Sequence, residues 1–165
     1  YYIIGHSMGS MVSRAALAKY SYLYDGAVLL GTVNTRLPLD AGIVLTRTIC
    51  RLKGGFYRSK TLDRLLLNLS NAKIENPVNE YAWVSRDEQV SKAYAEDPLC
   101  NFHFTARAYS DLIFLLSYVS QKDWARKIGK LLPVLICGGS DDPVGNYGKG
   151  IRQVEKRLKK CFTCR

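Results

Sequence analysis

The sequence lacks any long hydrophobic run: none of its 165 residues lies in a stretch of 18 or more consecutive apolar residues. A helix needs about 20 such residues to cross a bilayer, so we expect no membrane-spanning segment. The chain begins with Tyr1 rather than Met, and no basic region precedes the apolar residues 1–5, so we expect neither a signal peptide nor a natural start. Its length and its 47% hydrophobic composition are typical of one globular domain.

Acidic residues are scarce, with 14 Asp and Glu against 24 Lys and Arg, for a net charge of +10. Much of the excess lies in residues 149–165, which hold seven Lys or Arg and one Glu. Such a stretch can bind nucleic acid, an anionic membrane surface or an acidic partner. It lacks the interleaved aromatics that stack on bases, so we expect no nucleic acid. The solvated face of an amphipathic helix is the favoured interpretation, with transient contact to a membrane surface left open.

The cysteines are five, an odd number, and they are scattered through segments with the patterns of regular structure. Reduced thiols explain this distribution best and favour a cytoplasmic protein. Cys161 and Cys164 have CxxC spacing, but no second pair completes a tetrahedral metal site. We therefore expect no metal and no cofactor.

Short apolar segments, each followed by glycine, predict three strands at residues 1–4, 27–30 and 133–137. Residues 8–20 and 150–160 have helical patterns. The order strand, helix, strand, insertion, strand, helix predicts an α/β fold with a parallel sheet and crossover helices. We expect the first strand to be buried.

The apolar spacing within each predicted helix indicates the face that packs. These positions are Met8, Val12, Ala15 and Ala16 in the first helix, and Ile151, Val154 and Leu158 in the last.

The insertion, residues 34–130, is mostly helical in pattern. One apolar stripe comprises Tyr109, Leu112, Ile113, Leu116 and Val119, and residues 64–69 and 87–94 suggest two more helices. A helical block of about 100 residues between consecutive strands predicts a cap or lid over a substrate pocket. Residues 1–33 and 131–165 would then form an incomplete core.

Residues 5–9, Gly-His-Ser-Met-Gly, fit the pattern G-x-S-x-G between a predicted strand and a predicted helix. Such a turn strains the serine, and we expect Gly5 and Gly9 to remove Cβ atoms that would clash. Ser7 would lie at a helix amino terminus, where negative charge is favoured. The N–H of Met8 would face the developing oxyanion, and one such donor contributes roughly 3–4 kcal/mol. Ser7 is the predicted nucleophile.

A serine hydroxyl needs a base, and in this fold the order along the chain is Ser, acid, His. Asp141 and Asp142 follow the third predicted strand, and spacing alone does not choose between them. No His follows Asp142; His6 is the second residue of the motif, and His103 lies in the insertion. We interpret both histidines as packing or pocket residues, so the catalytic His and the second oxyanion donor are expected outside this chain.

Several segments together resemble the lysophospholipase and monoacylglycerol lipase group of α/β hydrolases, which is classed with the serine aminopeptidases. Residues 5–10 resemble the nucleophile elbow of that group, and Asp142 matches its acid, just before Pro-Val. The remaining matches are 24–32 for the next strand, 83–87 and 96–100 for the cap, and 132–136 running into 139–145 for the acid loop.

The resemblance implies an α/β-hydrolase fold with a helical cap, present as an internal fragment. A complete parent would hydrolyse a carboxylic ester, such as a monoacylglycerol or a lysophospholipid, through an acyl-enzyme on Ser7. The fragment alone would be inactive. Two alternatives remain open: an aminopeptidase with the same triad, and a non-catalytic binding protein on a hydrolase scaffold.

Overall fold

The computed structural model describes residues 1–35, 39–129 and 131–163, and it divides into two compact units. The first unit comprises Tyr1–Ala41 and Asp111–Arg165, and the second comprises Gly42–Ser110. The second unit lies inside the stretch predicted to form a cap, whereas residues from 111 onward belong with the first unit. The cap itself stays a prediction. Among the described residues, no helix has the length and apolar character to span a membrane.

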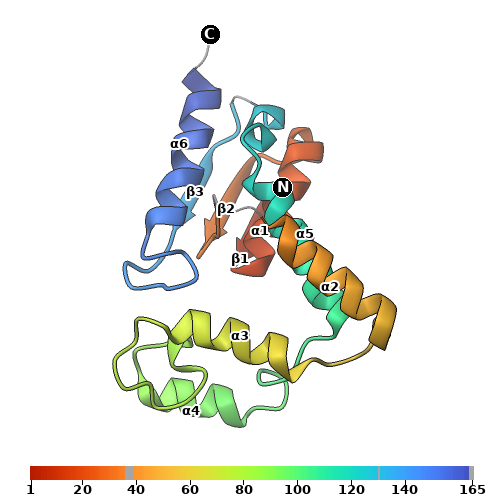
Figure 1. Ribbon diagram of the computed structural model, residues 1–165. Coiled ribbons are helices and arrows are strands. Elements are labelled where there is room, and N and C mark those ends of the chain that lie inside the picture. Colours follow the sequence, from red (N-terminus) through yellow and green to blue (C-terminus); the bar gives the residue numbers. More distant parts are fainter. Residues whose placement is uncertain (36–38, 130, 164–165) are drawn as a thin grey trace. The chain divides into compact units, whose positions relative to one another are not determined.

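The first unit is built on a three-stranded parallel sheet in the order β1-β2-β3 (Figure 1). The strands are β1 (Tyr2–His6), β2 (Gly26–Leu30) and β3 (Val134–Cys137). Their register pairs Ile3 with Ala27 and Ala27 with Val134. All three predicted strands are present, and the predicted parallel α/β fold is confirmed.

Three helices of the first unit pack on one face of this sheet: α1 (Met8–Tyr20), η3 (Trp124–Lys127) and α6 (Lys149–Thr163). The short helix η1 (Ser21–Leu23) follows α1 and has no buried residue. The core cluster joins Leu17 of α1, Trp124 of η3 and Val154 of α6 to the face of the sheet that carries Ile3 and Ala27. Val154 is 0% exposed and Leu158 is 4% exposed, so the predicted packing face of α6 is confirmed. Burying each such side chain contributes roughly 1.5–3 kcal/mol.

The opposite face of the sheet corrects the expectation that the first strand is buried. Tyr2 is 73% exposed and Ile4 is 69% exposed, and Leu135 on the same face of β3 is 57% exposed. Side chains alternate between the two faces of a strand, and α1, η3 and α6 cover only the other face. The described residues therefore leave an apolar sheet face uncovered.

The predicted packing face of α1 is wrong. Met8 is 47% exposed and Val12 is 52% exposed. The buried positions are Ser10, Met11, Ser13, Arg14, Leu17 and Ala18. Small serines let the helix approach the sheet closely, so the buried stripe is only partly hydrophobic and the apolar spacing indicates the wrong face.

Arg14 is the largest polar side chain in the core, and its side chain is fully buried. Its guanidinium donates to the carbonyl of Val33 (Nη1 to O, 2.6 Å) and to the carbonyl of Val119, and it lies 4.3 Å from the centroid of the Trp124 ring. Burial, and secondarily the charge of Arg157, lower the pKa of Arg14 to about 9. The group is still charged at neutral pH and is held by backbone carbonyls and an aromatic ring.

Like Arg14, Arg157 of α6 bonds both the segment that follows β2 and the segment that ends at Ser120. Its Nη1 donates to Asn34 Oδ1 at 2.7 Å and to the carbonyl of Ser120 at 2.8 Å. The two segments also bond each other, from the Thr35 N–H to Ser120 Oγ at 3.2 Å. The chain that leaves β2 is thus tied to the carboxyl end of α5 (Ala106–Ser120) within the first unit.

The second unit is helical. It contains α3 (Lys60–Asn71), η2 (Ala82–Val84) and α4 (Glu88–Glu96), together with most of α2 (Asp40–Lys53) and the start of α5. Side chains cap two of these helices: Ser59 Oγ accepts from the Leu62 N–H at 3.4 Å, and Asp87 Oδ1 accepts from the Gln89 N–H at 2.9 Å. The helices predicted at residues 64–69 and 87–94 are confirmed.

Replacing Arg14 with Met should lower the free energy of unfolding by roughly 2–4 kcal/mol, because the carbonyls of Val33 and Val119 would lose their donor in a buried site. The measurement is urea unfolding followed by circular dichroism. The exposed Arg126, changed to Met, is the matched control and should shift the free energy by less than about 0.5 kcal/mol. Equal stability of the two variants would contradict a structural role for the buried guanidinium.

Candidate active site

Ser7 occupies the turn between β1 and α1 with φ 51° and ψ −119°, a conformation that an L-residue rarely adopts. Hydrogen bonds hold it there. Its N–H donates to the carbonyl of Leu30 at 2.9 Å, and its carbonyl accepts from Ser10 Oγ at 2.6 Å and from the Ser10 N–H at 3.0 Å. The strained turn predicted from the sequence is therefore present.

The two glycines of the motif differ in what they permit. A Cβ on Gly5 would lie 2.3 Å from Ser13 Oγ and 2.4 Å from the carbonyl oxygen of Gly9, far inside contact distance. A Cβ on Gly9 would meet no described atom within 4 Å. The expectation that both glycines remove clashing Cβ atoms holds for Gly5 and is wrong for Gly9, because only Gly5 lies beneath the first turn of α1.

The hydroxyl of Ser7 does not cap α1, although Ser7 is the N-cap residue. Met8 is the first residue of that helix, so its N–H has no acceptor within the helix. Ser7 is half-buried and the Met8 side chain is exposed. The arrangement leaves a hydroxyl beside a backbone donor at the positive end of a helix dipole, where a developing oxyanion would be stabilised.

Asp142 lies in the loop after β3 and is tied to its backbone. Its Oδ1 accepts from the Val144 N–H at 2.8 Å, and its carbonyl accepts from the Tyr147 N–H at 2.8 Å. Its Oδ2 lies 3.7 Å from the position of a Cβ on Gly31, the residue that follows β2. Asp142 is half-buried whereas Asp141 is exposed. This geometry favours Asp142 as an orienting acid, and that role stays a prediction.

His6 is a neighbour of Asp142 rather than a remote residue. A Cβ placed on Gly31 would lie 3.7 Å from His6 Nε2 and 3.7 Å from Asp142 Oδ2, so both side chains border Gly31. The register pairs His6 with Leu30 and Leu30 with Cys137, so all three following loops start at one edge of the sheet. Ligands of open α/β sheets bind at this carboxyl edge. The structure brings Ser7, Asp142 and His6 to it.

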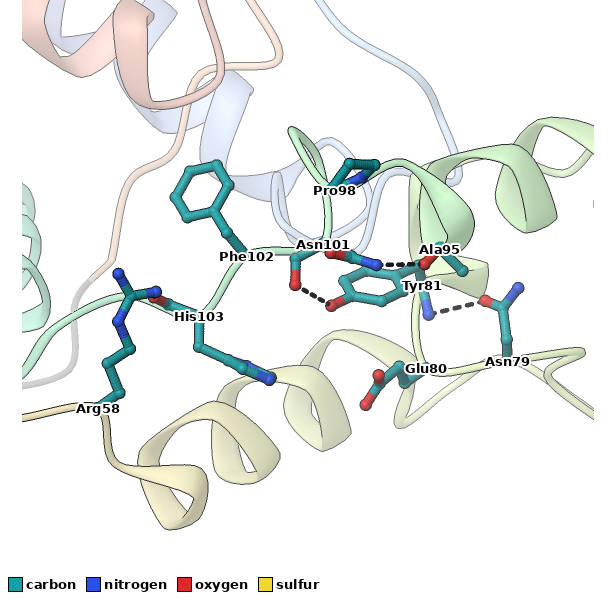
Figure 2. Close-up of a pocket in the computed structure, with 9 residues that line it drawn as sticks. All are labelled: Arg58, Asn79, Glu80, Tyr81, Ala95, Pro98, Asn101, Phe102 and His103. Carbon is teal, nitrogen blue, oxygen red and sulfur yellow. Dashed lines mark hydrogen bonds between the residues drawn. The ribbon is translucent and has the colours of Figure 1, made fainter.

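His103 lies in the second unit and lines a cavity of about 390 Å³ (Figure 2). Hydrogen bonds fix the wall of this cavity. Tyr81 Oη donates to the carbonyl of Asn101 at 3.3 Å, and Arg58 Nη1 donates to the carbonyl of His103 at 2.9 Å. His103 thus lines a pocket, one of the two roles, packing or pocket residue, that we expected for it. The full lining is Arg58, Asn79, Glu80, Tyr81, Ala95, Pro98, Asn101, Phe102 and His103.

The buried carboxylate of Asp63 contacts the His103 ring. Asp63, whose side chain is 5% exposed, lies 3.1 Å from His103 Nδ1 through its Oδ2 and accepts from Tyr109 Oη through its Oδ1. Burial, followed by the hydrogen bond to Asp63, raises the pKa of Tyr109 well above its ordinary value, so Tyr109 stays a donor. The sequence placed Tyr109 in an apolar stripe and gave no signal for Asp63, which resembles an ordinary acid in the first turn of a helix.

No metal site is formed by the described residues: they contain no group of three or more His, Cys, Asp or Glu placed to bind one ion. Four cysteines are described without a disulfide: Cys50, Cys100, Cys137 and Cys161. The predicted CxxC pair involves Cys164, which lies outside the described residues.

Replacing Gly5 with Ala should lower the free energy of unfolding by about 1–3 kcal/mol, because the added methyl would collide with the backbone of Gly9 and force the turn to shift. Thermal and urea unfolding of the complete protein would measure this. Gly9→Ala is the control and should be neutral or slightly stabilising, because Ala is favoured over Gly within a helix. A loss at Gly9 as large as that at Gly5 would mean that the second glycine is restricted too.

Comparison with known proteins places these features in a family. The model of the family described as serine aminopeptidase, S33, matches residues 1–164. A highly thermostable carboxyl esterase from Bacillus coagulans, solved in complex with glycerol, is 27% identical, with a TM-score of 0.87, over 98% of this chain and 53% of that chain. A lipase solved in an open form is 22% identical, with a TM-score of 0.83, over 96% of this chain and 52% of that chain.

The chain thus spans about half the length of these two structures. No curated protein matches it. The family match covers nearly the whole sequence, and the structural likeness extends over both units, although the lipase, at its lower identity, supports the fold alone. The chain belongs to the S33 serine aminopeptidase family and has the α/β-hydrolase fold.

Proposed function

We propose that the complete protein hydrolyses carboxylic esters through an acyl-enzyme on Ser7. The observation that carries this proposal is the state of Ser7. Its backbone is strained, its hydroxyl does not cap α1, and the residue lies next to the N–H of Met8. Strain of this kind is retained where function requires it. A turn with only a structural role would not need a serine whose hydroxyl makes no capping hydrogen bond.

In the proposed reaction, Ser7 Oγ attacks the ester carbonyl carbon while an imidazole takes its proton. The carbonyl oxygen becomes an oxyanion beside the Met8 N–H. Collapse of this intermediate expels the alcohol, which receives the proton from the imidazole, and leaves an acyl-serine. Water then attacks the acyl carbon in the same way and releases the acid. Asp142 would orient the imidazole and stabilise its charged form.

The imidazole would have to bridge Ser7 and Asp142 at the carboxyl edge of the sheet. His6 lies beside Asp142, but it is the residue directly before the nucleophile, and consecutive side chains of a strand point to opposite faces. His103 belongs to the second unit. We therefore assign the base to a histidine elsewhere in the complete protein and place it after Asp142 along the chain.

For the substrate, we propose a monoacylglycerol or lysophospholipid-type lipid. The similarity to a carboxyl esterase, at 27% identity, supports an ester substrate. An aminopeptidase is the alternative, and a pair of carboxylates that holds a substrate ammonium would favour it. The cavity around His103 belongs to the second unit and Ser7 to the first, so its lining does not decide between an ester and a peptide substrate.

Replacing Ser7 with Ala should abolish both hydrolysis of p-nitrophenyl butyrate and labelling by a fluorophosphonate probe, because both require the Ser7 hydroxyl. Gel fluorescence and a colorimetric assay on the complete protein would measure them. Ser117→Ala is the matched control, since Ser117 lies on α5, outside the turn at Ser7, and this variant should keep its labelling. Equal labelling of wild type and Ser7→Ala would remove Ser7 from the mechanism, and an unlabelled wild type would favour a non-catalytic binding protein.

Asp142→Asn should reduce kcat roughly 10³–10⁴-fold, as expected when the acid that orients a catalytic histidine is lost. The neighbouring Asp141→Asn should leave kcat nearly unchanged, because Asp141 is exposed whereas Asp142 is half-buried. Steady-state kinetics on the same ester would separate the two. A larger loss at Asp141 would reverse the assignment of the acid.

A further inference from the structure

Helix α6 carries a stripe of cations on its exposed side. The five cations that form it, all exposed, are Lys149, Arg152, Lys156, Lys159 and Lys160. At 3.6 residues per turn, they fall within an arc of about 100°, along a length of roughly 16 Å. We call this set the basic stripe.

The rest of α6 is already used by the fold. Val154 and Leu158 are buried in the core cluster, and Cys161 and Phe162 pack against it. Arg157 bonds the segments at Asn34 and Ser120. The helix therefore cannot roll to hide its cations, and the basic stripe must face outward from the first unit.

Acidic residues in α6 offset little of the positive charge of the basic stripe. Glu155 is the only acid in α6, and it bonds Lys159 at 2.6 Å. An exposed pair of this kind contributes little to stability, with a median of about 0–1 kcal/mol. Solvated surfaces of stable domains usually mix both signs of charge, whereas this stripe concentrates one sign along a line.

We propose that the basic stripe of α6 docks the protein on an anionic lipid surface. A straight line of charges fits a plane of headgroups, which presents anions at any spacing, and juxtamembrane cations contribute about 1 kcal/mol each. The stripe offers no aromatic side chain for stacking on bases, because Phe162 is packed inward. Four of its five cations are Lys, whose ammonium acts as a point charge. The guanidinium of Arg, which binds phosphates and bases through two parallel hydrogen bonds, occurs only once in the stripe.

The contact would be electrostatic and reversible, since the described stripe contains no apolar side chain that could insert into the bilayer. Salt should weaken it strongly, because exposed charges are screened over about 10 Å at 0.1 M ionic strength. This inference rests on the proposed function only for its purpose: a hydrolase of monoacyl lipids gains local substrate by residing on the surface that holds them.

The experiment measures sedimentation of the complete protein with vesicles of 30% phosphatidylserine in phosphatidylcholine, against vesicles of phosphatidylcholine alone. We expect binding to the anionic vesicles only, and its loss at high salt. The triple variant Lys149→Gln, Lys156→Gln, Lys160→Gln should weaken binding roughly a hundredfold, at about fivefold per cation. All three positions are exposed, so the melting temperature should not change.

The matched control is Lys53→Gln, Lys60→Gln, Lys92→Gln, which removes the same charge from exposed positions of the second unit. It should retain most of the binding, and equal loss in both triples would overturn the stripe in favour of net charge. Wild type that ignores anionic vesicles, or that binds duplex RNA more tightly than vesicles at equal phosphate, would also overturn the proposal. Hydrolysis of soluble p-nitrophenyl butyrate should be equal in all three proteins, so a failure of the proposed function appears separately as an inactive wild type.

Discussion

The turn at Ser7 is the constraint from which the geometry of the first unit follows. Because the chain reverses there at a positive φ and is bonded to Leu30, α1 leaves the sheet edge in one direction only. That direction brings Gly9 and Ser13 onto Gly5, where even a methyl group would not fit. The rotation of α1 about its axis is therefore set by the turn, so Met8 and Val12 face outward although both are apolar, whereas Met11 and Leu17 are buried.

The same rotation buries Arg14, two turns into the helix, and this burial connects the candidate site to the rest of the chain. A guanidinium in the core needs acceptors, and the chain supplies carbonyls from Val33 and Val119 rather than a carboxylate. These carbonyls lie in the segment that leaves β2 and in the last turn of α5. Arg157 bonds the same two segments from α6. The helix that follows the nucleophile thus helps to determine where the insertion departs and returns.

Sequence patterns predict this molecule well where hydrophobicity and turn chemistry agree. The three strands, the strained serine and the packing face of α6 follow from apolar runs, G-x-S-x-G and regular spacing. The packed face of α1 does not, because close approach through serines replaces hydrophobic contact. The cluster of Asp63, His103 and Tyr109 could not be predicted from the sequence either. Asp63 and Tyr109 are 46 residues apart in the chain, and each member resembles an ordinary surface or core residue. Contacts that depend on tertiary placement have no local signal.

The candidate site depends on the register of the sheet more than on any contact between its own side chains. Ser7, Gly31 and Gly138 each follow a strand whose last residues are paired, so three loops begin side by side at one edge. Ser7 is held there by the bond to Leu30, and Asp142 is held by its own loop, through the N–H of Val144. Neither residue needs the other in order to be placed. In the proposed mechanism an imidazole would lie between these two positions, and their independent placement would give the preorganisation that a nucleophile and its orienting acid require.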